Sequence, residues 1–351
     1  MAAVHQIAAG AAPRDAITNH LIASRALFRS WGLESEIFAE AMDPSLAGDV
    51  LPARDYPDRT SADDLAILHY SIHSSAFDIA AKHADRCAFH YHNITPASYL
   101  WRYAPLVAAE CARGRAQLPA YRDHVAASWA DSRFNAQELT TLGYDGVQSL
   151  GILRTPLSFG GAAERDPVGP PRMLFVGRGI PNKAQHDLIF ALAALHEERI
   201  PATLTLVGSW DASPCYRDLC TTLASRLGVN HYLRMLGSID NEALADEYRA
   251  ANLFVCLSDH EGFCVPALEA IDADLPIVAY AAGALPETVG GAGLLLSEKA
   301  PSLVAEAVME VHENAALRGS FADARTTQRE HFAPDAVGNR LKTALAEIGA
   351  L

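Results

Sequence analysis

The segment from Ser258 to Glu269 constrains this chain more than any other, because it places two glutamates at the start of one helix. Glu261 and Glu269 have seven residues between them, and the apolar run 253–257 before them is typical of a fully buried parallel strand. Pro266 suits the first position of a helix, where its missing N–H is not needed. We therefore expect Glu261 in a strand-to-helix loop and Glu269 in the first helical turn, at the carboxyl edge of a sheet, where ligands bind in open α/β folds.

This arrangement suits a ligand that carries both hydroxyl groups and negative charge. Carboxylates accept hydrogen bonds from sugar or ribose hydroxyls, and the free N–H groups of a helix N-terminus bind phosphate. The alternative is that Glu269 only complements the helix dipole and that Glu261 is a solvated loop charge. The residues around the pair favour the binding site.

The surrounding residues resemble the donor-site signature of family-4 retaining glycosyltransferases, which have the GT-B fold. The matching stretches are 260–270, 275–279 and 283–290. The resemblance implies that Glu261 holds hydroxyls of the transferred sugar and that Glu269 holds the ribose of the nucleotide. It also implies donor contacts from the residues between them, Gly262, Phe263, Cys264 and Val265. The chain departs from many relatives at 272–274, where it has Asp272-Ala-Asp274 and many relatives have a glycine that ends the helix. Asp tolerates the left-handed conformation of such a helix end better than most residues.

Composition is typical of a soluble globular protein rather than of a nucleic-acid-binding or disulfide-rich one. The 351 residues are enough for two domains, and 50% hydrophobic with 20% charged residues is typical of globular proteins. A net charge of −14 argues against non-specific nucleic-acid binding. The six cysteines form no Cys-x-x-Cys pair, so we expect neither a disulfide framework nor a metal site. We find no secretory signal and no apolar run of about 20 residues, which predicts a cytoplasmic location.

Strands alternate with helices along the chain, which predicts parallel sheets. The second half has expected strands at 173–176, 202–207, 232–236, 253–257 and 277–280, and the first half has expected strands at 4–8, 34–39, 65–70 and 87–91. A Gly/Pro-rich stretch at 160–171 is typical of a linker. We therefore predict two Rossmann-like domains facing each other across a cleft: residues 1–160 for the acceptor and residues 172–330 for the nucleotide sugar. Residues 331–351 are predicted to form a helix that, by resemblance to GT-B proteins, crosses back to the first domain.

The loop at 177–183 brings two cations to the first strand end of the second domain. Arg178 offers a planar fork of donors and Lys183 a mobile point charge, and together they can neutralise a diphosphate. The family resemblance implies that they grip the donor phosphates without a metal. The alternative is a pair of solvated loop cations; in either case we expect replacement to change stability by no more than about 0.5 kcal/mol.

In the first domain, His92 follows a buried strand, and the resemblance implies that it contacts the donor sugar near the reacting carbon. His90 is a competing candidate, because alternation along the strand points both side chains the same way. Asn93 and Thr95 are weaker candidates for the acceptor. Gly10, in the loop expected after the first strand, is a candidate for close approach to the donor. Asp15 is an acceptor candidate or a helix cap, with the cap preferred, and the turn at Leu236 is expected to face the nucleobase.

The combined prediction is a retaining hexosyltransferase that needs no cofactor and no metal. It would move a hexose, mannose or glucose by preference, from a UDP- or GDP-sugar to a glycan or lipid-linked acceptor by front-face displacement. Alternatives are a nucleotide-sugar epimerase of the same fold or a catalytically silent scaffold. The stretch 101–117 either touches the inner face of a membrane or is an ordinary amphipathic core helix.

Overall fold

The computed structural model describes residues 3–160 and 169–351, which form two compact units. The first unit comprises residues 1–96, 109–155 and 331–351, and the second comprises 97–108 and 156–330. Most of the predicted linker, 161–168, lies outside the described residues. The division differs from the predicted one at 97–108, which groups with the second unit because it packs there; Tyr103, for example, stacks near Tyr216 with ring centres 5.5 Å apart.

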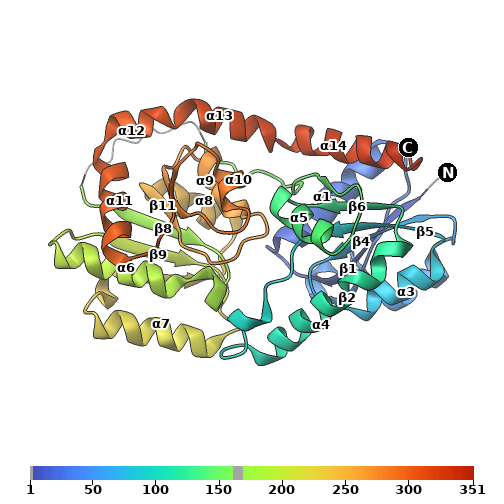
Figure 1. Cartoon of the computed structure of the whole chain (residues 1–351), viewed down its shortest axis with the longest axis horizontal. Coiled ribbons are helices and arrows are strands. Elements are labelled where there is room, and N and C mark those ends of the chain that lie inside the picture. Colours follow the sequence, from blue (N-terminus) through green and yellow to red (C-terminus); the bar gives the residue numbers. More distant parts are fainter. Residues whose placement is uncertain (1–2, 161–168) are drawn as a thin grey trace. The chain divides into compact units, whose positions relative to one another are not determined.

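The first unit contains a seven-stranded sheet of order β3-β2-β1-β4-β5-β6-β7, whose paired strands all run parallel (Figure 1). Its strands are β1 (Val4–Ala11), β2 (Ile37–Met42), β3 (Leu51–Pro52), β4 (Leu65–Tyr70), β5 (Arg86–Tyr91), β6 (Ala127–Ala130) and β7 (Gln148–Ser149). Every residue of β4 is buried, as its continuous apolar character predicts for a central parallel strand. The strand order reverses between β1 and β4, so ligand-binding loops are expected at the carboxyl ends of these two strands.

Helices cover this sheet, and their starts are marked by polar capping residues. They are α1 (Ala16–Ser30), α2 (Tyr56–Arg59), α3 (Ser75–His83), α4 (Pro105–Tyr121), α5 (Arg133–Thr141) and α14 (Pro334–Glu347), with the start of α4 in the second unit. Asp15 caps α1 by accepting from the N–H of Thr18, as the preferred interpretation predicted. Ser132 caps α5 in the same way through Asn135.

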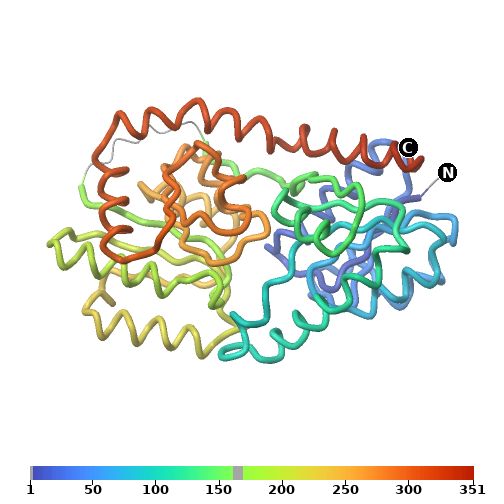
Figure 2. Tube along the Cα trace, in the orientation of Figure 1, coloured from blue at the N-terminus to red at the C-terminus, as the bar shows by residue number. Residues whose placement is uncertain are grey.

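The two ends of the chain meet in one hydrophobic core of the first unit, where Figure 2 shows the blue and red ends of the trace together. Val4 of β1 and Phe28 of α1 pack in the same buried cluster as Leu341 and Leu345 of α14. Arg340 adds a hydrogen bond of 2.9 Å from its Nε to the carbonyl of Leu150. Residues 331–351 thus complete the core of the first unit.

The second unit contains a six-stranded parallel sheet of order β10-β9-β8-β11-β12-β13. Its strands are β8 (Arg172–Val176), β9 (Thr203–Val207), β10 (Leu233–Gly237), β11 (Leu253–Cys256), β12 (Ile277–Tyr280) and β13 (Leu294–Leu296). Its helices are α6 (Gln185–Glu197), α7 (Pro214–Arg226), α8 (Asn241–Ala250), α9 (Val265–Asp272), α10 (Leu285–Val289), α11 (Pro301–Glu313), α12 (Ala315–Ser320) and α13 (Ala322–His331). The order reverses at β8 and β11, so the loops that follow these strands lie at the switch point.

Three sequence-based placements were wrong in detail. Glu269 is the fifth residue of α9 and therefore lies in its second turn, because the helix begins at Val265, one residue before the proline. Gly10 lies within β1, paired with Ala41, because this strand continues to Ala11. The predicted helix at 101–117 begins only at Pro105. In contrast, Asp274 has φ 52° and takes the left-handed conformation at the end of α9, as its residue type allowed.

Candidate donor-binding site

Two loops of the second unit, one after β8 and one after β11, are joined at the switch point of the sheet. The N–H of Asp259 donates to the carbonyl of Asn182 at 2.8 Å, and Nδ2 of Asn182 donates to the carbonyl of His260 at 3.2 Å. Between these backbone contacts, Nζ of Lys183 lies 2.6 Å from Oε2 of Glu261. Residues 78 positions apart in the sequence therefore form one rigid edge.

The Lys183–Glu261 ion pair is largely shielded from water, whereas the neighbouring arginine is open to it. The side chains of Lys183 and Glu261 are 18% and 7% exposed, and Arg178 is exposed. The carbonyl of Arg178 accepts from Nε2 of Gln185 at 2.8 Å, which holds the loop while leaving the guanidinium group outside. A half-buried cation, Lys183, and an exposed one, Arg178, thus belong to the same short loop.

Two glycines allow the backbone to approach closely around this pair. A Cβ on Gly283 would lie 2.3 Å from the carbonyl oxygen of Glu261, and its φ of 59° also disfavours a side chain. The next residue, Ala284, donates its N–H to that same carbonyl at 2.9 Å. On the other loop, a Cβ on Gly179 would lie 2.1 Å from the ring of Trp210. These contacts explain why the motifs require glycine at both places.

The second glutamate of the motif is held by a tyrosine from α8. The hydroxyl of Tyr248 donates to Oε2 of Glu269 at 2.8 Å and also lies 3.1 Å from the carbonyl of Pro266. Glu269 is half-buried. Its carboxylate is therefore oriented by a neutral donor, and a carboxylate is the kind of acceptor that a hydroxyl-bearing ligand requires.

The remaining predicted donor residues lie around the same edge. Cys264 precedes α9 with φ 75°, a left-handed conformation that is unusual for a residue with a side chain. Val265 is the first residue of that helix, and the buried Phe263 and half-buried Gly262 lead into it. Leu236 lies near the end of β10 and is half-buried. Their donor contacts remain predictions.

A third cation, Lys299, supports the loop and was not predicted from the sequence. Nζ of Lys299 lies 2.6 Å from a carboxylate oxygen of Asp187 and 2.6 Å from one of Asp259. Burial lowers the pKa of Lys299, but the two carboxylates outweigh it and raise the pKa on balance, so the ammonium group stays charged. One signal for this contact was visible in the sequence, the position of Asp259 inside the motif. It did not indicate Lys299 as the partner, because Lys299 lies 40 residues further along the chain.

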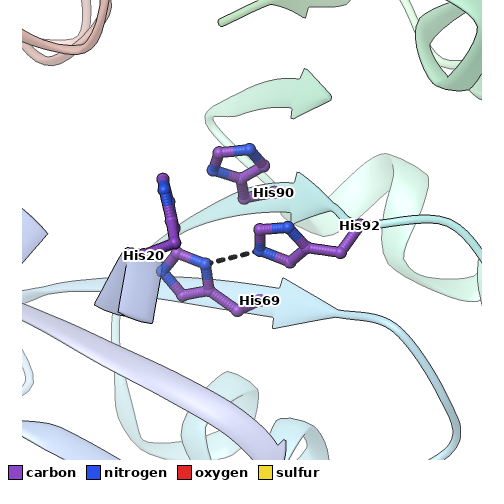
Figure 3. Close-up of side chains that lie close together, drawn as sticks. All are labelled: His20, His69, His90 and His92. Atoms are coloured by element: carbon purple, nitrogen blue, oxygen red, sulfur yellow. Dashed lines mark hydrogen bonds between the residues drawn. The ribbon is translucent and has the colours of Figure 1, made fainter. Parts of the chain in front are cut away.

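In the first unit, His92 belongs to a buried histidine network. Nδ1 of His92 lies 2.9 Å from Oδ2 of Asp131, and its Nε2 lies 2.8 Å from Nδ1 of His69. Nε2 of His90 lies 3.0 Å from the other oxygen of Asp131, so both strand histidines point the same way, as alternation predicted. Figure 3 shows His20 of α1 beside these three rings. The side chain of His92 has an exposed fraction of 0%.

The other candidates of the first unit are scattered rather than clustered. Gly10 is exposed at the end of β1, and Asp15 is engaged as the cap of α1. Asn93 has φ 69°, and its Nδ2 donates to Oδ1 of Asn135 at 2.9 Å. Thr95 is half-buried. The predicted role of Gly10 toward the donor and those of the other three toward an acceptor remain predictions.

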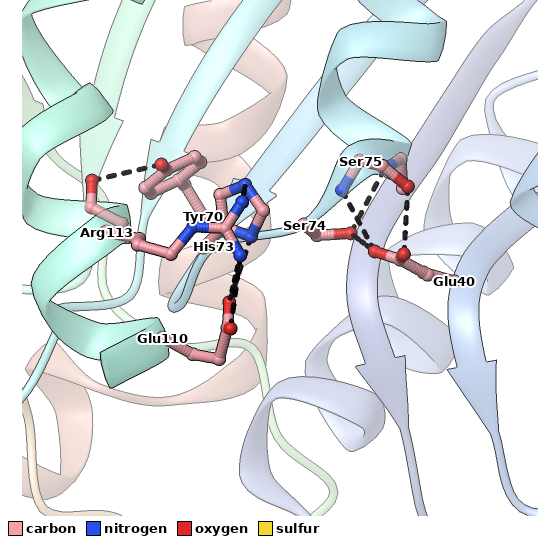
Figure 4. A network of polar contacts seen from close by, with 9 residues as sticks. Glu40, Tyr70, His73, Ser74, Ser75, Glu110 and Arg113 are labelled. Atoms are coloured by element: carbon pink, nitrogen blue, oxygen red, sulfur yellow. Dashed lines mark hydrogen bonds and ion pairs between the residues drawn. The ribbon is translucent and has the colours of Figure 1, made fainter. Parts of the chain in front are cut away.

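A polar network that sequence analysis missed lies past the end of β4 (Figure 4). Ser75 donates to Glu40 from its N–H at 2.9 Å and from its hydroxyl at 2.8 Å, and the Ser74 hydroxyl also donates to that carboxylate. These hydroxyl bonds, Ser74 first, lower the pKa of Glu40. Close by, Nδ1 of His73 lies 3.0 Å from Oε2 of Glu110. No spacing in the sequence connects these residues, because they come from separate elements.

The chain is similar to known glycosyltransferases in two respects. The first is the fold: the structure superposes with a TM-score of 0.79 on Anabaena Alr3699/HepE solved in complex with UDP and glucose, covering 99% of this chain and 100% of that one at 16% identity. The two parallel sheets and this likeness confirm the expected GT-B fold.

The second respect is the family model described as "Glycosyl transferases group 1", which matches residues 162–328. That segment contains the loops of the candidate site. The D-inositol 3-phosphate glycosyltransferase of Streptomyces avermitilis is 33% identical over 187 residues, 50% of this chain and 40% of that protein. The O-antigen chain mannosyltransferase B of Escherichia coli is 34% identical over 125 residues, 35% of this chain and 32% of that protein. The matches therefore span about two-fifths or less of these curated relatives.

Among the described residues, no helix combines the length and apolar character that crossing a bilayer requires. Trp101 and Leu106 are large apolar side chains with exposed fractions of 52% and 84%. Both lie in the 97–108 segment of the second unit. Exposed apolar groups of this size are candidates for contact with a partner or a lipid surface.

Proposed function

We propose that this protein is a glycosyltransferase that takes a sugar from a nucleotide-diphosphate donor bound on its second unit. The observation that carries the proposal is the contact between Lys183 and Glu261, 2.6 Å long, at the switch point of the sheet. It joins the cationic loop and the glutamate motif into one site, inside the segment that matches group 1 glycosyl transferases. A site for a charged, hydroxylated ligand is what this combination of groups can form.

In the proposed reaction, the two cations stabilise the leaving group. Breaking the bond between the anomeric carbon and the phosphate oxygen leaves negative charge on the nucleoside diphosphate. The exposed guanidinium of Arg178 is available to bind the diphosphate, while the Lys183 ammonium is already fixed by Glu261. A fixed cation interacts more strongly with the transition state than with the ground state, which is the requirement for catalysis. These side chains supply charge where a divalent ion would otherwise be needed, so we propose metal-independent donor binding.

The two glutamates are assigned to opposite ends of the donor. Glu261, next to the phosphate-binding cations, would accept from hydroxyls of the transferred hexose. Glu269, oriented by Tyr248, would accept from the ribose. We propose retention of the donor's anomeric configuration by front-face attack, in which the leaving phosphate helps to remove the proton of the acceptor hydroxyl.

Donor and acceptor identities are proposed from what similar proteins bind or make. A UDP- or GDP-hexose, with glucose or mannose as the sugar, fits the UDP and glucose of the Anabaena protein and the mannosyl transfer named for the Escherichia coli relative. The acceptor would be a glycan or lipid-linked saccharide. Trp101 and Leu106, 52% and 84% exposed, would give peripheral contact with a membrane surface.

The proposed contact between His92 and the donor sugar is not carried forward. The His92 side chain is 0% exposed, and both of its ring nitrogens already have hydrogen-bond partners. A direct polar contact with a sugar would require one of these bonds to break. We therefore assign the polar side-chain contacts with the donor to residues of the second unit.

The test is turnover with a panel of UDP- and GDP-sugars, followed by nucleotide release and by NMR of the sugar product. We expect one donor to release its nucleotide and the Lys183→Met variant to release it at least about 100-fold more slowly. Lys82→Met, which removes an exposed lysine of α3, is the matched control and should behave as the wild type. Isomerised sugar without transfer would indicate an epimerase, and absence of release with every donor would indicate a silent scaffold; both outcomes contradict the proposal.

A further inference from the structure

Four histidines of the first unit gather at one point near the switch point of its sheet. His20 comes from α1, His69 from β4, His90 from β5 and His92 from the residue after β5. All four are buried, and each offers one ring nitrogen such that these nitrogens lie within 4.8 Å of one another (Figure 3). The residues are up to 72 positions apart, so only the fold brings them together.

We propose that this histidine cluster, His20, His69, His90 and His92, binds one divalent transition-metal ion of the zinc type, with Asp131 as the carboxylate that orients the ligands.

The spacing of the rings fits a tetrahedral ion. Zinc binds imidazole nitrogen at 2.0–2.1 Å, and four rings arranged tetrahedrally around it would have centres about 5.2 Å apart. Five of the six ring-centre distances in the cluster fall between 5.0 and 5.4 Å, and the sixth, His90 to His92, is 4.5 Å. No large rearrangement of the rings is needed.

Asp131 determines which nitrogens carry lone pairs. A carboxylate only accepts hydrogen bonds, so Nε2 of His90 and Nδ1 of His92 must both be the protonated nitrogens. Nδ1 of His90 and Nε2 of His92 therefore carry the lone pairs that a metal requires. A ligand histidine whose other nitrogen donates to a carboxylate is the usual outer-shell arrangement of metal sites.

The other two rings complete the set with small adjustments. Nε2 of His92 and Nδ1 of His69 are 2.8 Å apart, and because Nε2 of His92 accepts, Nδ1 of His69 carries the proton between them. Metal binding at both nitrogens requires this proton to move to Nε2 of His69, which changes the tautomer and leaves the ring neutral. Nδ1 of His20 accepts from the N–H of Leu153 at 2.9 Å, so His20 can bind through Nε2 only when this bond is released. We therefore expect His20 to contribute least to affinity.

Two histidine nitrogens without hydrogen-bond partners and the buried charge of Asp131 also support a bound cation. Nε2 of His20 and Nδ1 of His90 are buried without a hydrogen-bond partner among the described residues, which is uncommon for buried polar atoms. The Asp131 carboxylate, 2% exposed, carries a negative charge that a divalent cation balances.

The proposed ion has a role separate from donor binding. All four histidines and Asp131 belong to the first unit, whereas the phosphate-binding cations belong to the second. The ion would hold α1, β4 and β5 together at one edge of the sheet. The bound ion can be measured without any sugar donor. A result that contradicts the metal site would therefore leave the proposed transferase activity unaffected, and a protein without transferase activity could still bind the ion.

The experiment is metal analysis of untagged protein produced in zinc-supplemented medium and freed of loosely bound ions by desalting with EDTA. We expect about one zinc per chain in the wild type, and intense visible absorption of a tetrahedral site after cobalt replaces zinc. The His90→Ala variant should lose the metal, whereas His231→Ala, which removes an exposed histidine of the second unit, should keep it.

Asp131→Asn is the companion variant in case His90→Ala does not fold. It preserves the size of the side chain and should weaken zinc binding about 10- to 100-fold in competition with a chromophoric chelator. The proposal would be overturned if the wild-type protein contained no zinc after production in supplemented medium and after refolding with zinc. An ordered water would then be the occupant of the cluster. Equal zinc content in the wild type, His90→Ala and Asp131→Asn would overturn it as well.

Discussion

Replacing Lys183 by methionine tests whether the cation beside Glu261 is part of a buried pair or a solvated loop charge. From the sequence, Lys183 is expected to be an exposed loop cation whose replacement changes the free energy of unfolding by no more than about 0.5 kcal/mol, whether or not it binds phosphate. The structure changes this expectation, because the two side chains are only 18% and 7% exposed and their charged atoms are 2.6 Å apart. The variant has a similar side-chain volume, is one heavy atom shorter and lacks the charge.

The expected loss of stability follows from the distance between the two charged groups and from their burial. Two opposite charges 2.6 Å apart attract by about 6 kcal/mol at an effective dielectric constant of 20, and withdrawing each ion from water offsets several kcal/mol of this. Removing one partner leaves Glu261 as a buried charge without its cation, which typically costs about 3–5 kcal/mol. Because Lys183 retains some exposure, we expect the lower end, about 3 kcal/mol. At about 2–4 °C per kcal/mol for a domain of this size, Tm should fall by about 6–12 °C.

The assay is thermal and urea unfolding of the full chain followed by circular dichroism. Arg178→Met is the matched control, because it removes an exposed cation from the same loop and should shift Tm by only a degree or two. The double variant with Glu261→Gln should recover part of the loss, with a coupling free energy of about 0.5–3 kcal/mol. Equal Tm values for Lys183→Met and Arg178→Met would refute the reasoning.

The remaining predictions concern catalysis and surface binding. Glu269→Ala should raise KM for the donor more than it lowers kcat, because the ribose does not change during the reaction; unchanged donor affinity would remove Glu269 from the site. Turnover should be equal with and without added magnesium, and loss in EDTA with recovery in magnesium would contradict metal-independent donor binding. NMR of the product from an α-linked donor should show an α linkage; a β linkage together with an inactive Asp15→Asn variant would identify Asp15 as a general base instead. Replacing Trp101 and Leu106 by alanine should reduce sedimentation with anionic vesicles, and no change would exclude this surface as a membrane contact.

For the second unit, much of the site could be predicted from the sequence because its parts are local. The buried strand at 253–256 and the helix that begins at Val265 are each encoded by consecutive residues. Hydrophobic pattern and proline placement are short-range signals, so the loop between these elements was placed correctly. The start of the helix was misjudged by one residue, which moved Glu269 from the first turn to the second.

For the first unit, the histidines were visible individually but not as a cluster. Strand alternation predicted that His90 and His92 point the same way, and the structure agrees. Nothing in the spacing indicates that His20 and His69 join them, because the contact depends on how β1, β4 and β5 are ordered in the sheet. Ring spacing and the shared carboxylate of Asp131 exist only after the strands have paired.

The sequence by itself determined the alternation of strands and helices and the two-domain organisation that this alternation implies. It also determined the loops that carry Arg178 and Glu261. All of these follow from hydrophobic periodicity, capping residues and turn residues over a few positions. Tertiary structure alone decided which distant charges pair, as for Lys183 with Glu261 and Lys299 with Asp187, and which polar groups become buried together. It also decided that residues 331–351 complete the core of the first unit. The physical reason is that local conformation is set by neighbouring residues, whereas burial and the strength of an ion pair depend on surroundings that the chain acquires only when its sheets and helices pack.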